Sequence, residues 1–316
     1  MFSIKAGMFV LLLSLAFNGA GSCEAKKSDN AGSRNQTVNR SAPVNRQPES
    51  AAAKDDLKAL AQGQQSRMRN AFVAVARDIE TYEALKALAT GMPDLNRNYF
   101  ESNLVVAAFL GERPTGGYGV RFRSGGDKTL RIEETTPPRD AMVIQVITTP
   151  FSVVGVPVID QESLALDIGP AWSKGVRSFR VREGEFQMSG GITGRTEKFG
   201  IAGSLGLMRE GNLATLIFNL QSREGERTRT LKDAASGLVQ ADGSIAIARL
   251  GAGSFVDSPA DALRSVVQFA GQEKNLSLTF ESIPGIIADG FNGRGALKAE
   301  AAPQSTKDEG VGRKKP

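Results

Sequence analysis

The chain has 316 residues, no histidine, a single cysteine, and 39 basic against 34 acidic residues. Without histidine it can form no Ser-His-Asp triad, no Cys-His pair and no His-ligated metal site. Without a second cysteine it can form no internal disulfide. Chemistry based on carboxylate, lysine, serine, threonine or tyrosine side chains remains, as does a protein with no catalytic activity.

Residues 1–22 have the three zones of a secretory signal peptide. Lys5 supplies the positive charge, residues 8–17 form an apolar run, and residues 18–22 are small or polar. The apolar run is shorter than a helix needs to span a bilayer. We therefore expect a leader that is removed, not a membrane anchor.

Cys23 stands directly after this leader, where bacterial lipoproteins carry their lipidated residue. Ala20-Gly21-Ser22-Cys23 resembles a lipobox, with Ala at the position where Leu is most common. We expect Cys23 to be lipidated. The alternative is ordinary cleavage after Ser22 or Ala25, which would leave Cys23 without a role. An exported chain without a disulfide depends on its buried core for stability.

Two polar segments flank the body of the chain. Residues 24–54 are rich in Ser, Asn, Gln and Ala and contain no aromatic residue, so residues 23–54 are interpreted as the lipidated cysteine and a disordered tether. Residues 301–316 form a second disordered tail. The excess of basic residues lies in these segments and the leader, so the body is close to neutral. We expect no nucleic-acid partner, and membrane contact only through the lipid.

The first half of the body contains helix and strand patterns. Residues 55–69 resemble a polar, marginal helix. Asp78 is a predicted N-cap for a helix through Tyr82, Leu85 and Leu88. Short apolar or alternating runs predict strands at residues 72–76, 104–110, 119–123, 129–133, 141–148 and 151–156.

The second half is glycine-rich and typical of β structure. Ser258 and Pro259 predict the start of a helix that ends before Gly271. Strands and hairpins are predicted at residues 200–207, 213–220, 245–250, 275–281 and 294–300. Gly194, Gly200, Gly203 and Gly206 indicate a curved sheet, not a phosphate-binding loop.

These patterns predict a mainly β (α+β) protein. Its first domain, residues 55–168, should be a sandwich-like module of helix and antiparallel sheet. Its second, residues 172–300, should be a glycine-rich antiparallel β domain with one helix. Trp172 lies at the junction and is expected to be a packing residue.

The most distinctive stretch lies between two predicted strands and reads Leu110-Gly111-Glu112-Arg113-Pro114-Thr115-Gly116-Gly117-Tyr118. Adjacent glycines allow positive φ angles, and proline restricts the chain. We expect a preorganised binding loop. Its residues are Arg113, Pro114, Thr115, Gly116, Gly117 and Tyr118. The alternative is a plain turn in which Tyr118 covers the sheet and Arg113 is solvated.

Downstream of this loop follow Glu134-Thr135-Thr136-Pro137-Pro138 and Thr148-Thr149-Pro150-Phe151. In this order the three motifs resemble the PrcB family of protease-complex subunits, over about residues 72–160. The resemblance implies a non-catalytic lipoprotein subunit associated with an exported serine-type protease. Residues 172–300 lie outside it. More loosely, the loop is similar to the P-T-T-G-Y loop of chagasin-type cysteine-protease inhibitors, with Gly116 replacing a Thr.

We therefore expect an exported lipoprotein, anchored by its lipid on the periplasmic or cell-surface face of a membrane. It should be no enzyme, hold no cofactor or metal, and bind another exported protein, with a protease among the candidates. Two alternatives stay open. One is a protease inhibitor acting through residues 113–118, and the other is a hydrolase that uses carboxylates in the second half. Glu133 and Glu134 come nearest to a carboxylate pair, but neighbours on a strand point to opposite faces.

Overall fold

A computed structural model of the chain describes residues 57–125, 128–158, 163–190, 195–224, 227–251, 262–283 and 292–303. All of them belong to one compact unit, Ala52–Pro316. The predicted leader, Cys23, the tether and most of the predicted tail lie outside the described residues, as do Gly194, Ser258 and Pro259.

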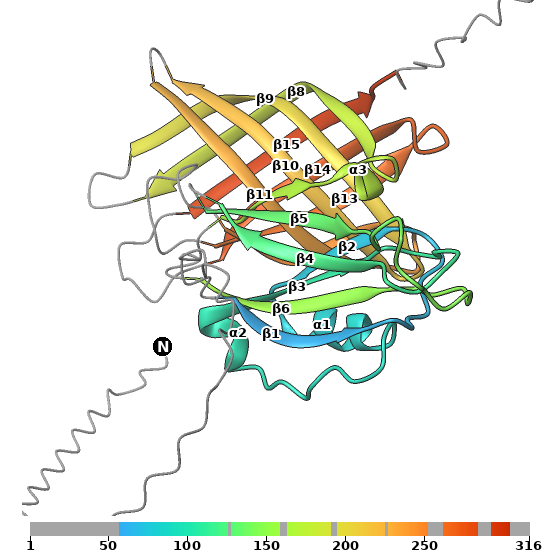
Figure 1. The fold of residues 1–316 in the computed structure, drawn as a ribbon. Helices are drawn as coiled ribbons and strands as arrows, with labels where there is room; N and C mark the ends of the chain where they lie inside the picture. Colours follow the sequence, from blue (N-terminus) through green and yellow to red (C-terminus); the bar gives the residue numbers. More distant parts are fainter. Residues whose placement is uncertain are drawn as a thin grey trace, which may run out of the picture. The chain divides into compact units, whose positions relative to one another are not determined.

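The first part of this unit, here called the N-terminal module, contains two sheets and three short helices (Figure 1). One sheet is antiparallel with the strand order β1-β6-β3-β2, and the other has the order β4-β5-β7, in which β5 and β7 are parallel. The strands are β1 (Lys58–Gly63), β2 (Phe72–Ala76), β3 (Asn103–Phe109), β4 (Gly119–Ser124), β5 (Thr129–Thr135), β6 (Phe151–Pro157) and β7 (Ala165–Ile168). The helices are α1 (Ile79–Lys86), α2 (Tyr99–Ser102) and α3 (Pro170–Ser173).

The composition of the central strands explains why they form the core of the module. β2, β3 and β6 consist mainly of Val, Ala and Phe, and nearly all their residues are buried, as expected for strands covered on both faces. Asp78 caps α1 as predicted, because its Oδ1 accepts a hydrogen bond from the Thr81 N–H at 2.7 Å. Tyr82 and Leu85 are buried on the inner face of α1.

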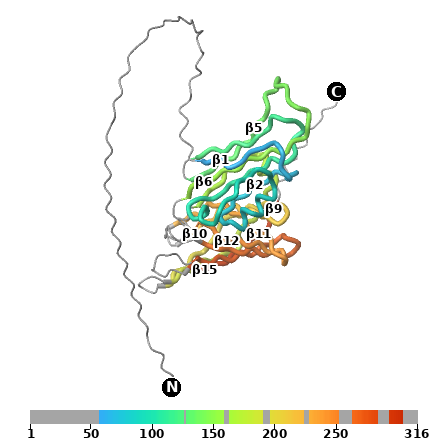
Figure 2. The backbone as a smooth tube through the Cα atoms, turned by 90° about the horizontal axis from the view of Figure 1, so that it is seen from below, coloured from blue at the N-terminus to red at the C-terminus, as the bar shows by residue number. Residues whose placement is uncertain are grey.

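The second part of the unit is a closed antiparallel barrel (Figures 1 and 2). Each strand pairs with the next along the chain, and the last pairs with the first. Inward positions are apolar and alternate with outward polar ones, most clearly along β14. The strands are β8 (Arg177–Gly190), β9 (Arg195–Glu210), β10 (Leu213–Glu224), β11 (Arg227–Val239), β12 (Ile245–Gly251), β13 (Ala262–Ala270), β14 (Asn275–Ile283) and β15 (Asn292–Ala301).

The predicted fold class is confirmed in its main statement: the protein is mainly β, with antiparallel sheets and few helices. Most predicted strands are present, and so are the hairpins at Gly211-Asn212 and Asp242-Gly243. The sandwich-like arrangement of the first module and the domain boundaries stay predictions.

Two predicted helices are wrong. Residues 58–63 of the expected polar helix form β1, because they pair with β6 and cover its free edge. Residues 262–270 of the expected second-half helix form β13, where Leu263, Ser265 and Val267 alternate inward along the barrel wall. In β1 the pairing with the distant strand β6 outweighs the local helix signal, and in β13 the pairing with the neighbouring strands β12 and β14 does so.

The strand predicted at residues 141–148 is also wrong. Its described residues form no strand, and the segment makes one isolated bridge, between Thr148 and Arg113. The β-branched residues that favour a strand are present, but no strand of the described chain lies along them.

The barrel covers the open edge of β2, which is the last strand in its sheet. An uncovered edge strand exposes unpaired N–H and C=O groups. Here the Val75 N–H donates to the Ser236 hydroxyl at 2.7 Å, and the Thr215 hydroxyl donates to the Val73 carbonyl at 2.6 Å. Thr215 and Ser236 are buried and bond each other at 2.7 Å. Two barrel hydroxyls therefore satisfy backbone groups that a further strand would otherwise pair.

A buried ion pair joins the module to the barrel beside this edge. Arg77 Nη2 lies 2.5 Å from Asp233 Oδ1, and both side chains are almost fully buried. The Asp233 carboxylate also accepts hydrogen bonds from the N–H groups of Leu164, Ala234 and Gly251 at 2.8 to 2.9 Å. Burial raises the pKa of Asp233, while Arg77 and these N–H donors act in the opposite direction. One carboxylate thus connects β11, β12 and the module.

Trp172 is fully buried in the core of the module, as its predicted packing role requires. Its indole N–H donates to the Phe109 carbonyl at 2.8 Å, which satisfies the polar atom of the buried ring. Barrel residues Met208, Leu213 and Ala234 belong to the same buried cluster. The core of the module is therefore completed by the outer wall of the barrel.

Candidate binding face

The predicted binding loop, residues 113–118, is held against the segment that precedes β6. The Arg113 N–H donates to the Thr148 carbonyl at 2.8 Å, and the Thr148 N–H donates back to the Arg113 carbonyl at 2.9 Å. The Thr148 hydroxyl donates to the Thr115 carbonyl, and the Gly116 N–H donates to the Ile144 carbonyl, each at 2.9 Å. These bonds fix the backbone of the loop in one conformation. Pro114 and Gly117 are exposed at its rim.

Two glycines with positive φ angles determine the backbone conformation of the loop and of its entry. Gly111 has φ +74°, and a Cβ there would lie 2.5 Å from the Arg69 carbonyl oxygen. Gly117 has φ +85°, and a Cβ there would lie 2.8 Å from Cβ of Pro137. Gly116 has no positive φ, and a Cβ there would make an ordinary contact with Ile144 at 3.8 Å. The predicted positive φ angle is therefore confirmed at Gly117, and Gly111 adds a second constrained position at the entry to the loop.

Arg113 and Tyr118 are more enclosed than solvated recognition residues would be. Arg113 Nε lies 2.8 Å from Glu134 Oε1, and their side chains are 20% and 26% exposed. Arg113 also donates to the Leu110 carbonyl at 2.9 Å, and its guanidinium lies 5.8 Å from the centre of the Tyr118 ring. Tyr118 is partly buried against the core of the module. Both side chains therefore stabilise the loop from within.

The segment next to the loop exposes apolar side chains. Met142 is 98% exposed, Ile144 74%, Val146 53% and Ile147 63%. Among the described residues, Val266 on the barrel is the one other large apolar side chain that is exposed. We call residues 142–147 the apolar strip. Because monomeric proteins rarely expose clustered apolar groups, the strip is a candidate interface.

The sequence prediction missed the strip because it interpreted residues 141–148 as a strand. The run from Ala141 to Phe151 is uncharged, but this alone does not distinguish an exposed segment from a buried strand. In Figure 2 the green chain between β5 and β6 projects beyond the neighbouring strands. The loop and the strip together form what we call the binding face.

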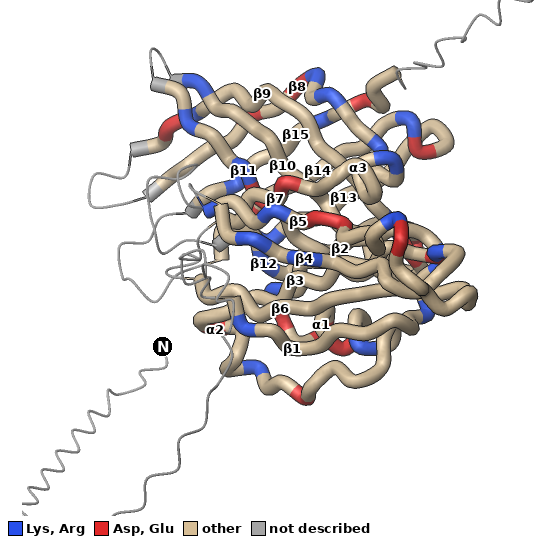
Figure 3. The backbone as a smooth tube through the Cα atoms, viewed as in Figure 1, with Lys and Arg blue, Asp and Glu red and all other residues tan. Residues whose placement is uncertain are grey.

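Charged residues of both signs are mixed along the described strands (Figure 3). Glu133 Oε2 lies 3.0 Å from Arg123 Nε, whereas Glu134 pairs with Arg113, so the two neighbouring carboxylates have separate arginine partners. Within the described ranges, no three His, Cys, Asp or Glu side chains lie close enough to hold a metal ion. None of the described helices combines the length and the apolar character needed to cross a membrane.

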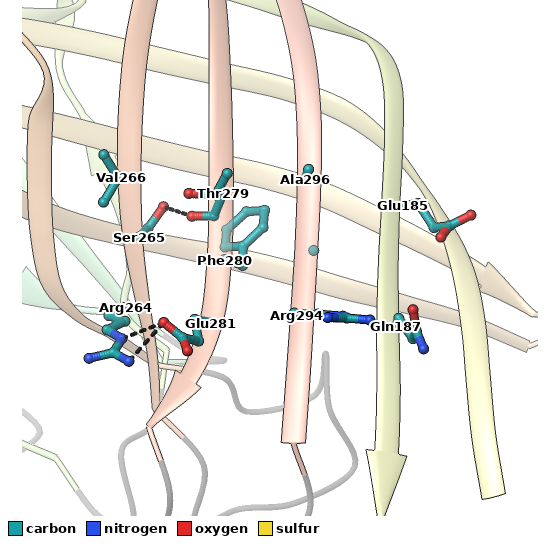
Figure 4. A pocket seen from close by; sticks show the side chains of 11 residues that line it. Glu185, Gln187, Arg264, Ser265, Val266, Thr279, Phe280, Glu281, Arg294 and Ala296 are labelled. Carbon is teal, nitrogen blue, oxygen red and sulfur yellow. Dashed lines mark hydrogen bonds and ion pairs between the residues drawn. The ribbon is translucent and has the colours of Figure 1, made fainter.

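A second candidate site is a pocket of about 520 Å³ on the outer face of the barrel. It spans β8, β13, β14 and β15. Figure 4 shows Arg264 paired with Glu281 on one side and Arg294 pointing toward Gln187 on the other. Arg264 Nη2 and Glu281 Oε2 are 2.7 Å apart. The sequence gives no signal for this pocket, because its residues alternate with inward ones as on any barrel strand.

The family model of the PrcB C-terminal domain matches residues 104–157. This match confirms the resemblance for the part of the chain that contains β3 to β6, the loop and the apolar strip. No curated protein matches the chain. The sequence from the apolar strand β3 to the end of β6 is thus similar to the PrcB C-terminal domain.

Proposed function

We propose that this protein is an exported, non-catalytic accessory subunit that binds another exported protein through the loop of residues 113–118. The proposed partner is a protease, because the PrcB C-terminal match suggests an accessory role in a protease complex. The match to residues 104–157 carries this proposal, since those residues contain the whole loop. The backbone bonds of the loop favour the same role, because a loop that is already ordered loses little entropy on binding.

The binding test compares full-length wild type with Pro114→Arg. Pro114 is exposed at the rim of the loop, so a longer charged side chain there should block a partner and leave the fold intact. Gln221→Arg is the matched control, because Gln221 is also exposed but lies on the barrel, outside the pocket between β8 and β13 to β15. Wild type and the control should capture an exported protease that Pro114→Arg does not. Equal capture by all three proteins would show that the loop of residues 113–118 is not the surface that binds the protease.

The proposed anchor is a lipid on Cys23. Lipoprotein modification adds two or three acyl chains, and a single chain binds a membrane only marginally. Wild type should therefore fractionate with membranes and incorporate fatty acid, whereas Cys23→Ala should be released as soluble protein. Ser28→Ala, in the tether, is the control and should behave as wild type. Soluble wild type without a fatty-acid label would leave ordinary leader cleavage as the explanation.

A further inference from the structure

The pocket of about 520 Å³ on the outer face of the barrel has a floor of short side chains and a rim of long ones. Val266, Thr279 and Ala296 lie side by side on β13, β14 and β15, because the register pairs Val266 with Thr279 and Thr279 with Ala296. The next row of outward residues lies two positions along each strand and is long and polar. It consists of Arg264, Glu281, Arg294 and Gln187 (Figure 4).

Most of the charge that lines the pocket is neutralised by ion pairs. Arg264 Nη2 lies 2.7 Å from Glu281 Oε2. The carboxylate of Glu185 lies 3.2 Å from Nζ of Lys198. Arg294 is exposed and has no ion-pair partner among the residues that the structure describes. The lining therefore carries one uncompensated positive charge.

Arg294 and Gln187 together offer hydrogen-bond donors at the rim of the pocket. The Arg294 side chain points toward Gln187 (Figure 4), and neither side chain bonds another residue within the described ranges. A guanidinium presents two parallel N–H groups to a carboxylate, and a carboxamide adds a further N–H donor. The ligand group that fits this part of the rim is a carboxylate.

Val266 makes the floor apolar on the side away from Arg294. It is 41% exposed and is the one large apolar side chain that the described part of the barrel exposes. Ala296 and the methyl group of Thr279 continue this surface toward β15. Because Val266 and Arg294 are two strand spacings apart, at least about 10 Å separates the apolar end of the pocket from the cation. A ligand that covers both has a carboxylate at one end and an apolar body of this length.

We propose that the pocket binds a small organic monocarboxylate, with its carboxylate on Arg294 and Gln187 and its apolar body over Val266. One negative charge neutralises the one unpaired cation, and the apolar body removes the exposed side chain of Val266 from water. An inorganic anion satisfies only the first contact, and a neutral amphiphile satisfies only the second. The site lies on the barrel, outside residues 104–157, and so goes beyond the proposed function.

The first test titrates octanoate into the full-length chain carrying Cys23→Ala, so that no attached lipid competes for the pocket. Isothermal titration calorimetry should show one octanoate bound per chain. Acetate has the charge without the apolar body, and octanamide has the body without the charge. Each should bind at least about tenfold more weakly than octanoate, because each lacks one of the two contacts.

The second test removes the unpaired cation in the Cys23→Ala chain. Arg294→Gln should raise the dissociation constant of octanoate about tenfold or more. Arg180→Gln is the matched control and should leave it unchanged. Arg180 is also an exposed barrel arginine that pairs with no carboxylate of the described chain, but it does not line the pocket. Both residues are exposed, so equal melting temperatures are expected.

The third test fills the floor without changing the charge. Ala296 is exposed in the middle of the floor, so the longer side chain of Ala296→Gln should occupy the place of the apolar body and weaken octanoate binding about tenfold. Ala202→Gln is the matched control, because Ala202 is exposed on β9 and lies outside the pocket. The control should bind octanoate as the Cys23→Ala chain does.

Three results would overturn the proposal. One is no binding of octanoate at concentrations of about 10 mM. Another is binding that Arg294→Gln and Arg180→Gln weaken equally, or that Ala296→Gln leaves unchanged. The third is acetate binding as strong as that of octanoate, which would reduce the site to a surface cation. None of these results affects the capture of a protease through Pro114, and loss of that capture leaves the pocket intact.

Discussion

Single side chains decide the shape of the binding loop. Arg113 stands where an exposed recognition residue was expected, but its guanidinium binds Glu134 and the Leu110 carbonyl and lies over the Tyr118 ring. Substituting Arg113 would therefore loosen the loop as well as remove a charge. The exposed rim at Pro114 is the position at which binding can be changed without altering these contacts.

Gly117→Val should destabilise the protein by about 1–3 kcal/mol. Valine at φ +85° is strained, and its Cβ would lie 2.8 Å from Pro137. Gly116→Ala is the matched control, because that residue has no positive φ and its nearest neighbour would lie 3.8 Å from a Cβ. Urea denaturation of the three proteins gives the free energies of unfolding. A loss of the same size in both variants would show that the conformation at Gly117 is not the cause.

Removal of one partner from the Arg77–Asp233 pair should cost about 3–5 kcal/mol, because the other charge stays buried. Arg77→Met and Asp233→Leu, each made alone, are expected to show this loss. The double variant should lose less than the sum of the two, since no uncompensated charge is left. A double-mutant cycle on the free energy of unfolding measures the difference. Additive losses would mean that the two side chains are not coupled.

Strands were predictable from sequence where their burial pattern is local. The buried runs of β2 and β3 and the alternation along β14 are visible in the residues themselves, as is the Asp78 cap of α1. β1 was missed because pairing with the distant strand β6 determines its conformation. β13 was missed because the helix-start residues Ser258 and Pro259 were given more weight than the alternation of Leu263, Ser265 and Val267.

The binding face was predictable only in part. The loop could be placed because its glycines and proline constrain the backbone locally. The apolar strip could not, because a β-branched run does not reveal whether the chain supplies a partner strand. The inward orientation of Arg113 depends on Glu134, 21 residues away, and has no local signal either.

Tyr82, a buried residue of helix α1, should make the stability of the folded protein sensitive to alkaline pH. Burial raises the pKa of Tyr82 to about 12 from an ordinary value of 10. Below pH 10 the phenol is neutral in both the folded and unfolded chains. Between pH 10 and 12 the unfolded chain loses the proton and the folded chain keeps it, so stability falls as pH rises.

Tyr82→Phe tests this sensitivity. The variant should cost about 1 kcal/mol near neutral pH, because the Tyr82 hydroxyl donates to the Pro93 carbonyl at 2.6 Å. From pH 10 to 12 wild type should lose stability faster than the variant, so the difference between their free energies of unfolding should shrink. Wild type and the variant contain the same other titrating groups, so the contributions of those groups cancel in the difference between the two free energies of unfolding. A difference that stays constant over this range would mean that Tyr82 titrates alike in both states.

The module and the barrel form one unit because they share buried groups. Thr215 and Ser236 satisfy the edge of β2, Asp233 bonds Arg77, and barrel side chains complete the core around Trp172. These contacts join residues that are far apart in the chain, so the sequence could predict two β-rich halves but not their common core. The barrel thereby supports the module that carries the binding face.

The most direct test of the proposed role is photo-crosslinking in the organism that carries this gene. A benzophenone amino acid placed at Pro114 lies on the exposed rim of the loop, and the same residue at Lys298, exposed on β15, is the control. We predict a crosslink between position 114 and an exported protease, identified by mass spectrometry, and no such product from position 298. If position 114 yields no adduct beyond those of position 298, the loop is not a docking site and the account of this protein as an accessory subunit acting through it is contradicted.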